Sequence, residues 1–167
     1  MARWKPPTPK SSPYITPAGY ATLHKELDNL WVKRAEVTEA VSAAAAEGDR
    51  SENAEYIYRK KQLREMDSRI RYLQKRLPEL NVVDVVGDPD TVRFGARVEL
   101  ERDDGQRLPY RIVGADEIDA KGDKISIDSP MARALIARRV DDEVEIAVSG
   151  QITHYLIVDI TYDSTKP

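Results

Sequence analysis

The sequence predicts an α+β protein, in which an antiparallel coiled-coil hairpin is followed by a small antiparallel β domain with one short helix. Apolar residues recur in alternating steps of three and four along two segments on either side of Gly48, which is the pattern of a two-stranded coiled-coil seam. Because the connection between the segments is short, the two helices must run antiparallel. From residue 81 onward, short β-rich runs separated by turn residues replace the helical pattern.

The two helices have recognisable ends as well as a seam. Thr16-Pro17 is typical of an N-cap followed by proline at the first helical position, and Gly48 provides a left-handed stop after about Glu47. Asp49 is expected to begin the second helix, which ends near Pro78. The expected seam consists of Leu23, Leu27, Leu30, Arg34, Val37, Val41 and Ala44 in the first helix and Leu63, Met66, Ile70, Leu73, Leu77 and Leu80 in the second.

The β domain begins with a predicted hairpin, since residues 96–102 and 107–113 flank Asp104-Gly105. Pro109 favours an edge position or a bulge in this hairpin. Ser129-Pro130 marks the start of a short helix, and further strands are expected at 124–127, 144–148 and 152–162. With the proline-rich N-terminus, the predicted organisation is a disordered extension over residues 1–15, a coiled-coil hairpin over 16–80 and the β domain over 81–167.

Composition narrows the possible functions. The chain of 167 residues has no cysteine and two histidines, so disulfides and thiolate metal sites are excluded and a transition-metal site is not expected. No apolar run approaches the ~20 residues needed to span a bilayer, and we expect a cytoplasmic protein without a membrane partner. A formal net charge of -3 argues against a protein that coats nucleic acid non-specifically.

An acidic cluster marks the connection between the two helices. Asp49 and Glu52 are three residues apart at the expected helix start, and this spacing has two interpretations. It is the spacing of a capping box, and it also places two hard oxygen ligands on one face, where they can complete the shell of a magnesium ion if other groups supply the remaining ligands. The two roles are compatible because each carboxylate has spare lone pairs.

The second helix continues as a basic segment with eight Lys and Arg residues between positions 59 and 76. One interpretation is a solvated helix with acid-to-base pairs four residues apart, namely Glu55–Arg59, Glu65–Arg69 and Asp67–Arg71. The other is a phosphate-binding flank away from the leucine seam; it would contain Lys60, Arg64, Arg71 and Lys75.

Two stretches resemble the signature of the Gre transcript-cleavage factors. They are Gly-Asp-Arg-Ser-Glu-Asn-Ala-Glu-Tyr at 48–56 and Ile-Ser-Ile-Asp-Ser-Pro-Met-Ala-Arg-Ala-Leu at 125–135. Arg50-Ser51, the basic segment and Met131 resemble the GreB branch most closely. The resemblance covers about residues 16–162 and implies an FKBP-like C-terminal domain.

The resemblance also implies a function and its residues. The protein would dock at the rim of the secondary channel of bacterial RNA polymerase through the segment of Asp128, Ser129 and Pro130. The coiled coil would enter the channel, and Asp49 and Glu52 would help to hold the second magnesium while the 3′ end of a backtracked RNA is cut. The chain would hold no magnesium alone, and it would be an accessory factor rather than an enzyme. The displaced RNA would contact Arg59, Lys60, Lys61, Arg64 and Arg71.

We expect a monomer with polymerase and nascent RNA as partners. The sequence alone also leaves alternative functions open. A non-catalytic regulator of the secondary channel would keep the hairpin and the docking segment without depending on Asp49 and Glu52. A free-standing module would be either an RNA-binding coiled-coil arm or a peptidyl-prolyl isomerase-like domain. Local chemistry alone explains Asp128, Ser129 and Pro130 as a helix start.

Overall fold

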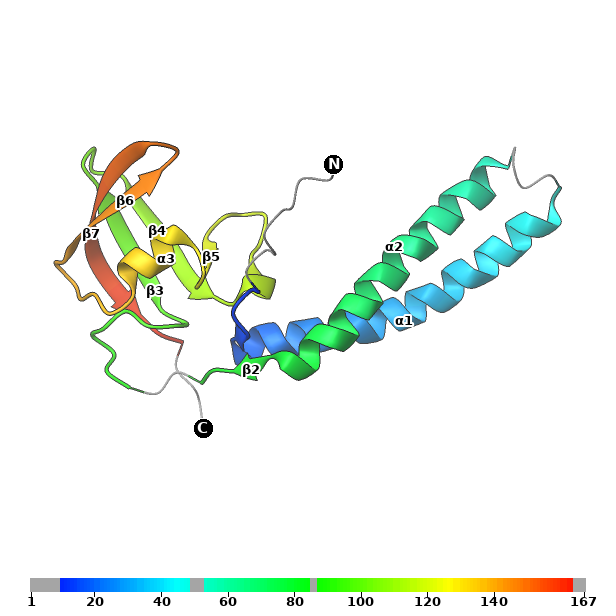
Figure 1. Ribbon diagram of the computed structural model, residues 1–167, viewed down its shortest axis with the longest axis horizontal. Coiled ribbons are helices and arrows are strands. Elements are labelled where there is room, and N and C mark those ends of the chain that lie inside the picture. Colours follow the sequence, from blue (N-terminus) through cyan, green and yellow to red (C-terminus); the bar gives the residue numbers. More distant parts are fainter. Residues whose placement is uncertain (1–9, 49–52, 85–86, 164–167) are drawn as a thin grey trace, which may run out of the picture. The chain divides into compact units, whose positions relative to one another are not determined.

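The computed structural model describes residues 10–48, 53–84 and 87–163. The chain divides into two compact units, one from Tyr20 to Leu80 and one that combines the residues before Tyr20 with those after Leu80. The first unit contains most of helix α1 (Pro17–Ala46), helix α2 (Ala54–Arg76) and the short 3-10 helix η1 (Leu77–Glu79). The two long helices lie side by side as a hairpin (Figure 1).

The predicted seam is confirmed by burial along the hairpin. Leu73 is fully buried, with 0% of its surface exposed, and the other seam positions are buried or half-buried. The side chains of Trp31 and Tyr72, outside the seam, are exposed. The buried seam residues are Leu23, Val37 and Ala44 of α1 and Met66, Ile70, Leu73, Leu77 and Leu80 of α2 and the residues after it.

Ion pairs between described residues also join the two helices. Arg34 of α1 binds Asp67 of α2, with 2.5 Å between Nε and Oδ1. Arg69 of α2 binds both carboxylate oxygens of Glu26 of α1, at 2.6 and 3.0 Å. Arg34 occupies a seam position, so this pair continues the interhelical contact where the apolar pattern is interrupted.

We expect acid to weaken the hairpin through Asp67. The hydrogen bond from Arg34 is the main cause that holds the pKa of Asp67 below its ordinary value of 3.8, with desolvation acting in the opposite direction. The pair therefore stabilises the fold fully above pH 3.8 and loses this contribution as the pH falls through the lower folded-state pKa. The effect is small because the two side chains are 35% and 36% exposed.

Acid unfolding followed by far-UV circular dichroism tests this expectation. Between about pH 5 and pH 2 the wild type should lose more stability than Asp67→Asn, which has no carboxylate to protonate at this position. An equal loss in the two proteins would contradict the role of Asp67.

The second unit is built on a five-stranded sheet of order β5-β4-β3-β7-β6. The β3–β4, β3–β7 and β6–β7 pairs are antiparallel, whereas β4 and β5 pair in parallel. The connection between β4 and β5 contains the 3-10 helix η2 (Ala115–Glu117), and it crosses over instead of making the tight turn that an antiparallel pair needs. The strands are β3 (Arg97–Arg102), β4 (Arg107–Val113), β5 (Lys124–Ser126), β6 (Glu143–Val148) and β7 (Gln151–Thr161).

The core of this unit lies between the sheet and helix α3 (Pro130–Leu135), which lies across one face of the sheet in Figure 1. Ala132 and Leu135 of α3 are fully buried, together with Leu100, Ile112 and Ile157 of the sheet. The α+β fold class is thereby confirmed. Pro109 pairs with Glu99 of β3 on one side, and on its other side it has no strand partner among the described residues, because β5 pairs only with residues 111–113 of β4. Pro109 thus lies at a local edge of the sheet, as expected.

The N-terminal segment corrects one prediction. Strand β1 (Tyr14–Ile15) pairs in parallel with β2 (Asn81–Val82), and Ile15 is fully buried. Thr16 is held as well, because its N–H donates to Oε2 of Glu117 at 3.0 Å and its hydroxyl donates to Oε1. Residues 14–15 thus do not belong to a disordered extension; their pairing partner is distant in sequence and composition could not reveal it. Residues 1–9 lie outside the described part of the chain.

Candidate functional site at the hairpin tip

The hairpin tip is bounded by two helix ends that the structure describes. Helix α1 ends at Ala46, and Gly48 has a φ of 135°, a left-handed value that favours glycine and confirms the predicted stop. Helix α2 begins at Ala54. The predicted acidic pair, Asp49 and Glu52, lies between these ends and outside the described residues.

The structure corrects the predicted start of the second helix. The N-cap is Asn53, with extended backbone dihedrals, and its Oδ1 accepts the N–H of Tyr56 at 3.1 Å. Asn is as good an N-cap as Asp, but the sequence prediction placed the helix start at Asp49 and did not single out Asn53. Helix α2 therefore requires neither Asp49 nor Glu52 as its cap, and the capping-box interpretation of this pair at the start of α2 is wrong.

Asn53 makes a second contact that the sequence did not indicate. Its Nδ2 donates to the carbonyl oxygen of Ala44 in the last turn of α1, at 2.8 Å. This carbonyl also accepts the N–H of Glu47 at 3.3 Å, so Asn53 adds a second, shorter hydrogen bond to it. One side chain thus caps a backbone donor of α2 and binds a backbone acceptor of α1.

The basic flank begins next to the tip. Arg59 is engaged locally, since its Nε lies 2.7 Å from Oε1 of Glu55 and its Nη1 donates to Gln62 at 3.2 Å. This is the expected pair at four-residue spacing. The ion pair with Glu55 partly compensates the charge of Arg59, and Arg71 lies near enough to Asp67 to help lower the pKa of that carboxyl.

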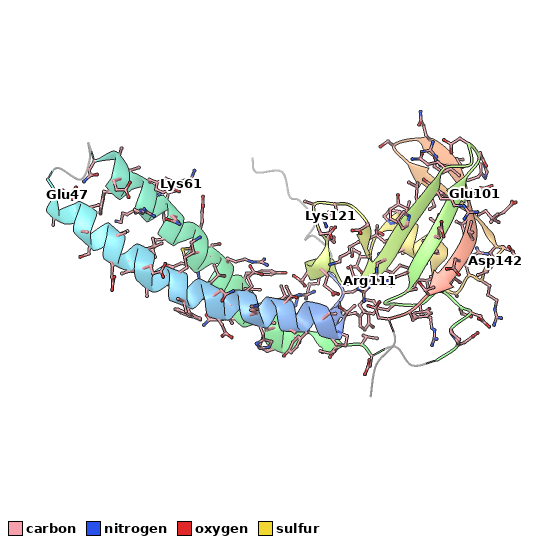
Figure 2. All side chains as sticks on the ribbon, turned by 180° about the vertical axis from the view of Figure 1, so that it is seen from behind. Glu47, Lys61, Glu101, Arg111, Lys121 and Asp142 are labelled. Atoms are coloured by element: carbon pink, nitrogen blue, oxygen red, sulfur yellow. The ribbon has the colours of Figure 1, made fainter. Side chains whose placement is uncertain are left out.

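The neighbouring cations are more available. Lys60 lies with its Nζ 5.4 Å from the ring centroid of Tyr56, and Lys61, labelled in Figure 2, projects from α2. Lys61 and Arg64 are exposed, and neither forms an ion pair with any residue that the structure describes. Arg71 is also exposed, with its Nε 3.4 Å from the carbonyl oxygen of Asp67. These four cations leave positive charge on an open helix surface, which suits a polyanion.

The predicted docking segment lies at the start of α3. Ser129 is the N-cap, with Oγ accepting the N–H of Ala132 at 3.2 Å, and Pro130 occupies the first helical position, where it is exposed. Asp128 is held by the N-terminal segment: the N–H of Ser12 donates to Oδ2 at 2.9 Å, and the Ser12 hydroxyl donates to Oδ1. Sequence reasoning missed Ser12, and no local pattern connects it to Asp128.

The carboxylates of Asp49 and Glu52 are the predicted ligands for a metal ion. Among the described residues, no group of three or more His, Cys, Asp and Glu side chains is arranged to hold a metal ion. Asp49 and Glu52 are carboxylates, the donor type that magnesium prefers, and two of them leave most of its octahedral shell to other ligands. They fit a magnesium ion that is shared with another protein or with phosphates.

A hollow on the sheet does not resemble an isomerase pocket. It has a volume of about 220 Å³ and is lined largely by charged side chains, among them Arg97, Glu99, Arg111 and Asp159. Small-molecule sites are usually ~300–1,000 Å³ and mainly apolar or aromatic.

None of the helices in the described ranges is both long and apolar enough to cross a membrane.

Comparison with known proteins identifies the family. The family model described as "Transcription elongation factor, N-terminal" matches residues 13–82, and that described as "Transcription elongation factor, GreA/GreB, C-term" matches residues 87–162. The chain is 56% identical to the transcription elongation factor GreB of Xanthomonas axonopodis pv. citri, over 98% of this chain and 99% of that protein. It is 53% identical to GreB of Pseudomonas aeruginosa, over 97% and 98%.

Among solved structures, Gfh1 of Thermus aquaticus matches with a TM-score of 0.43 and 25% identity, over 91% of this chain and 99% of that one. The two family models together span most of the sequence. The resemblance seen at residues 48–56 and 125–135 is thereby confirmed, and the chain belongs to the GreA/GreB family of transcription elongation factors, with a GreB-like sequence.

Proposed function

We propose that this elongation factor binds bacterial RNA polymerase through its secondary channel and stimulates the polymerase to cleave the 3′ end of backtracked nascent RNA, which rescues arrested complexes. The observation that carries the proposal is the match of the GreA/GreB family models to residues 13–82 and 87–162, and the cap of α2 supports it. Because Asn53 caps the helix, the two carboxylates of Asp49 and Glu52 are not needed there and can serve as oxygen ligands at the tip of the hairpin.

The hairpin supplies reach. Helix α1 has 30 residues, which corresponds to about 45 Å at 1.5 Å per residue. The buried seam and the interhelical pairs Arg34–Asp67 and Glu26–Arg69 hold the two helices together along this length. A narrow, two-helix arm of this kind suits entry into a channel of a larger enzyme.

The tip supplies ligands to a site that the polymerase completes. Asp49 and Glu52 would bind magnesium jointly with the polymerase, and the chain would hold none alone. When bound there, this ion would help to activate water or stabilise the leaving oxygen during phosphodiester cleavage. The factor thus acts as an accessory protein to a catalyst that is not its own, in the cytoplasm and as a monomer.

The flank and the docking segment supply binding. Lys60, Lys61 and Arg64, with Arg59 and Arg71, would contact the phosphates of the displaced RNA. The exposure of Lys61 and Arg64 without carboxylate partners in the described part of the chain supports this role. Asp128, Ser129 and Pro130 would contact the rim of the channel, and the exposed Pro130 at the start of α3 supports that assignment.

Backtracked transcription complexes test the proposal directly. Complexes with RNA labelled at its 5′ end are expected to yield shortened RNA when the protein and magnesium are added, and to resume elongation after nucleotides are supplied. Inhibition of elongation without shortened RNA would indicate a non-catalytic channel regulator. Binding to RNA without any effect on polymerase would indicate a free-standing RNA-binding arm, and either result would overturn the proposal.

Neutralising the flank is expected to weaken the contact with RNA in a salt-dependent way. In the double variant Lys60→Gln/Arg64→Gln, binding of the displaced RNA should weaken. The decrease of log affinity with log salt should also become shallower, by about 0.7 in slope for each lost phosphate contact. Crosslinking of the RNA 3′ segment to the factor at increasing salt measures this slope. The exposed Lys33 of α1 provides the control, because Lys33→Gln removes one charge elsewhere on the hairpin; an unchanged slope in the double variant would remove the flank from RNA binding.

A further inference from the structure

The side chain of Asn53 joins the two helix ends that border the tip. Its Oδ1 accepts the N–H of Tyr56 at 3.1 Å, while its Nδ2 donates to the carbonyl oxygen of Ala44 at 2.8 Å. The backbone carbonyl of Asn53 also accepts the N–H of Ile57 at 3.1 Å. The first residue before α2 is thus fixed to the last turn of α1, although nine positions separate it from Ala44 in sequence.

Among good N-cap residues, asparagine is suited to both contacts. Ser, Asp and Asn all offer the oxygen that accepts a backbone N–H at the start of a helix. A carboxylate has no proton to donate when it is ionised, and a serine hydroxyl is shorter and has one hydrogen, whereas a carboxamide carries an acceptor and two donors on one rigid group. The interhelical contact therefore depends on the amide nitrogen, while the cap does not.

The surroundings restrict the contact further. Ala44 is buried, with 4% of its surface exposed, and it is the last buried seam residue of α1. Tyr56, which donates its N–H to Asn53, is half-buried. The hydrogen bond between Asn53 and Ala44 thus continues the seam as a polar contact between the two described helix ends.

We propose that Asn53 is a positioning residue for transcript cleavage. By tying the start of α2 to the last turn of α1, it fixes the positions of the two helix ends from which the segment with Asp49 and Glu52 extends. This inference rests on the proposed function. Groups that complete a catalytic site must be held close to their productive geometry, and a displacement of ~1 Å can cost about 100-fold in rate. Asn53 contributes to cleavage through the two carboxylates and does not contact the RNA or the metal itself.

Substitutions at position 53 separate the interhelical bond from the cap. Asn53→Ser and Asn53→Asp keep an oxygen for the N–H of Tyr56 and lose the donor to Ala44. We expect both variants to remain helical and to bind polymerase as the wild type does. We also expect cleavage to fall about tenfold or more at a fixed magnesium concentration, the order seen when a group that orients a metal ligand is removed, and half-maximal cleavage to require more magnesium. Asn29→Ser, an exposed asparagine of α1, is the matched control and should behave as wild type.

The magnesium dependence distinguishes positioning from mere stabilisation. If Asn53 only stabilised the hairpin, Asn53→Ser would lower the unfolding midpoint and leave the magnesium dependence unchanged. Wild-type cleavage and magnesium dependence in both Asn53→Ser and Asn53→Asp, with Asp49→Asn inactive, would overturn this inference and leave the proposed function intact. Absence of stimulated cleavage by the wild-type protein would overturn both.

Discussion

Asp49→Asn is expected to lower the rate of transcript cleavage by about 100-fold or more, while binding to RNA polymerase is retained. The substitution keeps the size of the side chain and removes the negative charge that makes it a magnesium ligand. Losses of this order are typical when one preorganised group that stabilises a transition state is removed. The measurement is the rate of RNA shortening in backtracked complexes at saturating factor.

The control for Asp49→Asn is another acid near the tip. Glu47 lies just after α1 and is exposed, and Glu47→Gln removes the same charge without touching the predicted ligand pair. Glu47→Gln should cleave at a rate within about twofold of wild type, since an exposed charge interacts only weakly through solvent. Normal cleavage by Asp49→Asn would exclude Asp49 from the mechanism, and an equal loss in Glu47→Gln would indicate that only the total charge of the tip matters.

Leu73→Ala is expected to have the largest effect on the stability of the hairpin. Leu73 is fully buried in the seam, with 0% of its surface exposed, and truncation of a buried leucine costs about 2–5 kcal/mol through lost burial and the cavity left behind. Urea unfolding followed by circular dichroism at the helical minimum measures this cost. A loss below about 1 kcal/mol would show that the seam adapts around the missing side chain.

The adjacent Gln74 provides the matched control for Leu73. It lies on the exposed surface of α2, and Gln74→Ala should change stability by no more than about 0.5 kcal/mol. The hairpin and the β-sheet unit are separate compact units, so the helical signal reports the change in the hairpin most directly. Equal destabilisation by the two substitutions would contradict the assignment of the seam.

The features that sequence predicted well are those set by neighbouring residues. The seam followed from the spacing of Leu73 and its equivalents, and the stop at Gly48 followed from a conformation that glycine tolerates. The start of α3 followed from Ser129-Pro130, where a cap and a proline suffice. Each of these signals lies within one or two helical turns, so no knowledge of the tertiary fold was needed.

The features that sequence missed depend on contacts between distant segments. The predicted start of the second helix was Asp49, whereas the cap is Asn53, which also reaches Ala44 across the hairpin. The proline-rich segment before Thr16 suggested disorder, yet it supplies Ser12 to Asp128 and Ile15 to the core. No local pattern predicts such pairs. The roles of Asp49 and Glu52 and of the RNA-binding and docking residues stay predictions.

The pairing of β1 with β2 has a consequence for how this protein can be divided. Because Tyr14–Ile15 lies beside Asn81–Val82, the hairpin is an insertion within a globular domain whose chain is discontinuous. A fragment starting at residue 81 would lack Ile15 and would leave Glu117 without Thr16. A variant in which a short linker replaces Tyr20–Leu80 would keep both β1 and β2. Such a shortened protein would allow binding to polymerase to be measured without the coiled-coil hairpin.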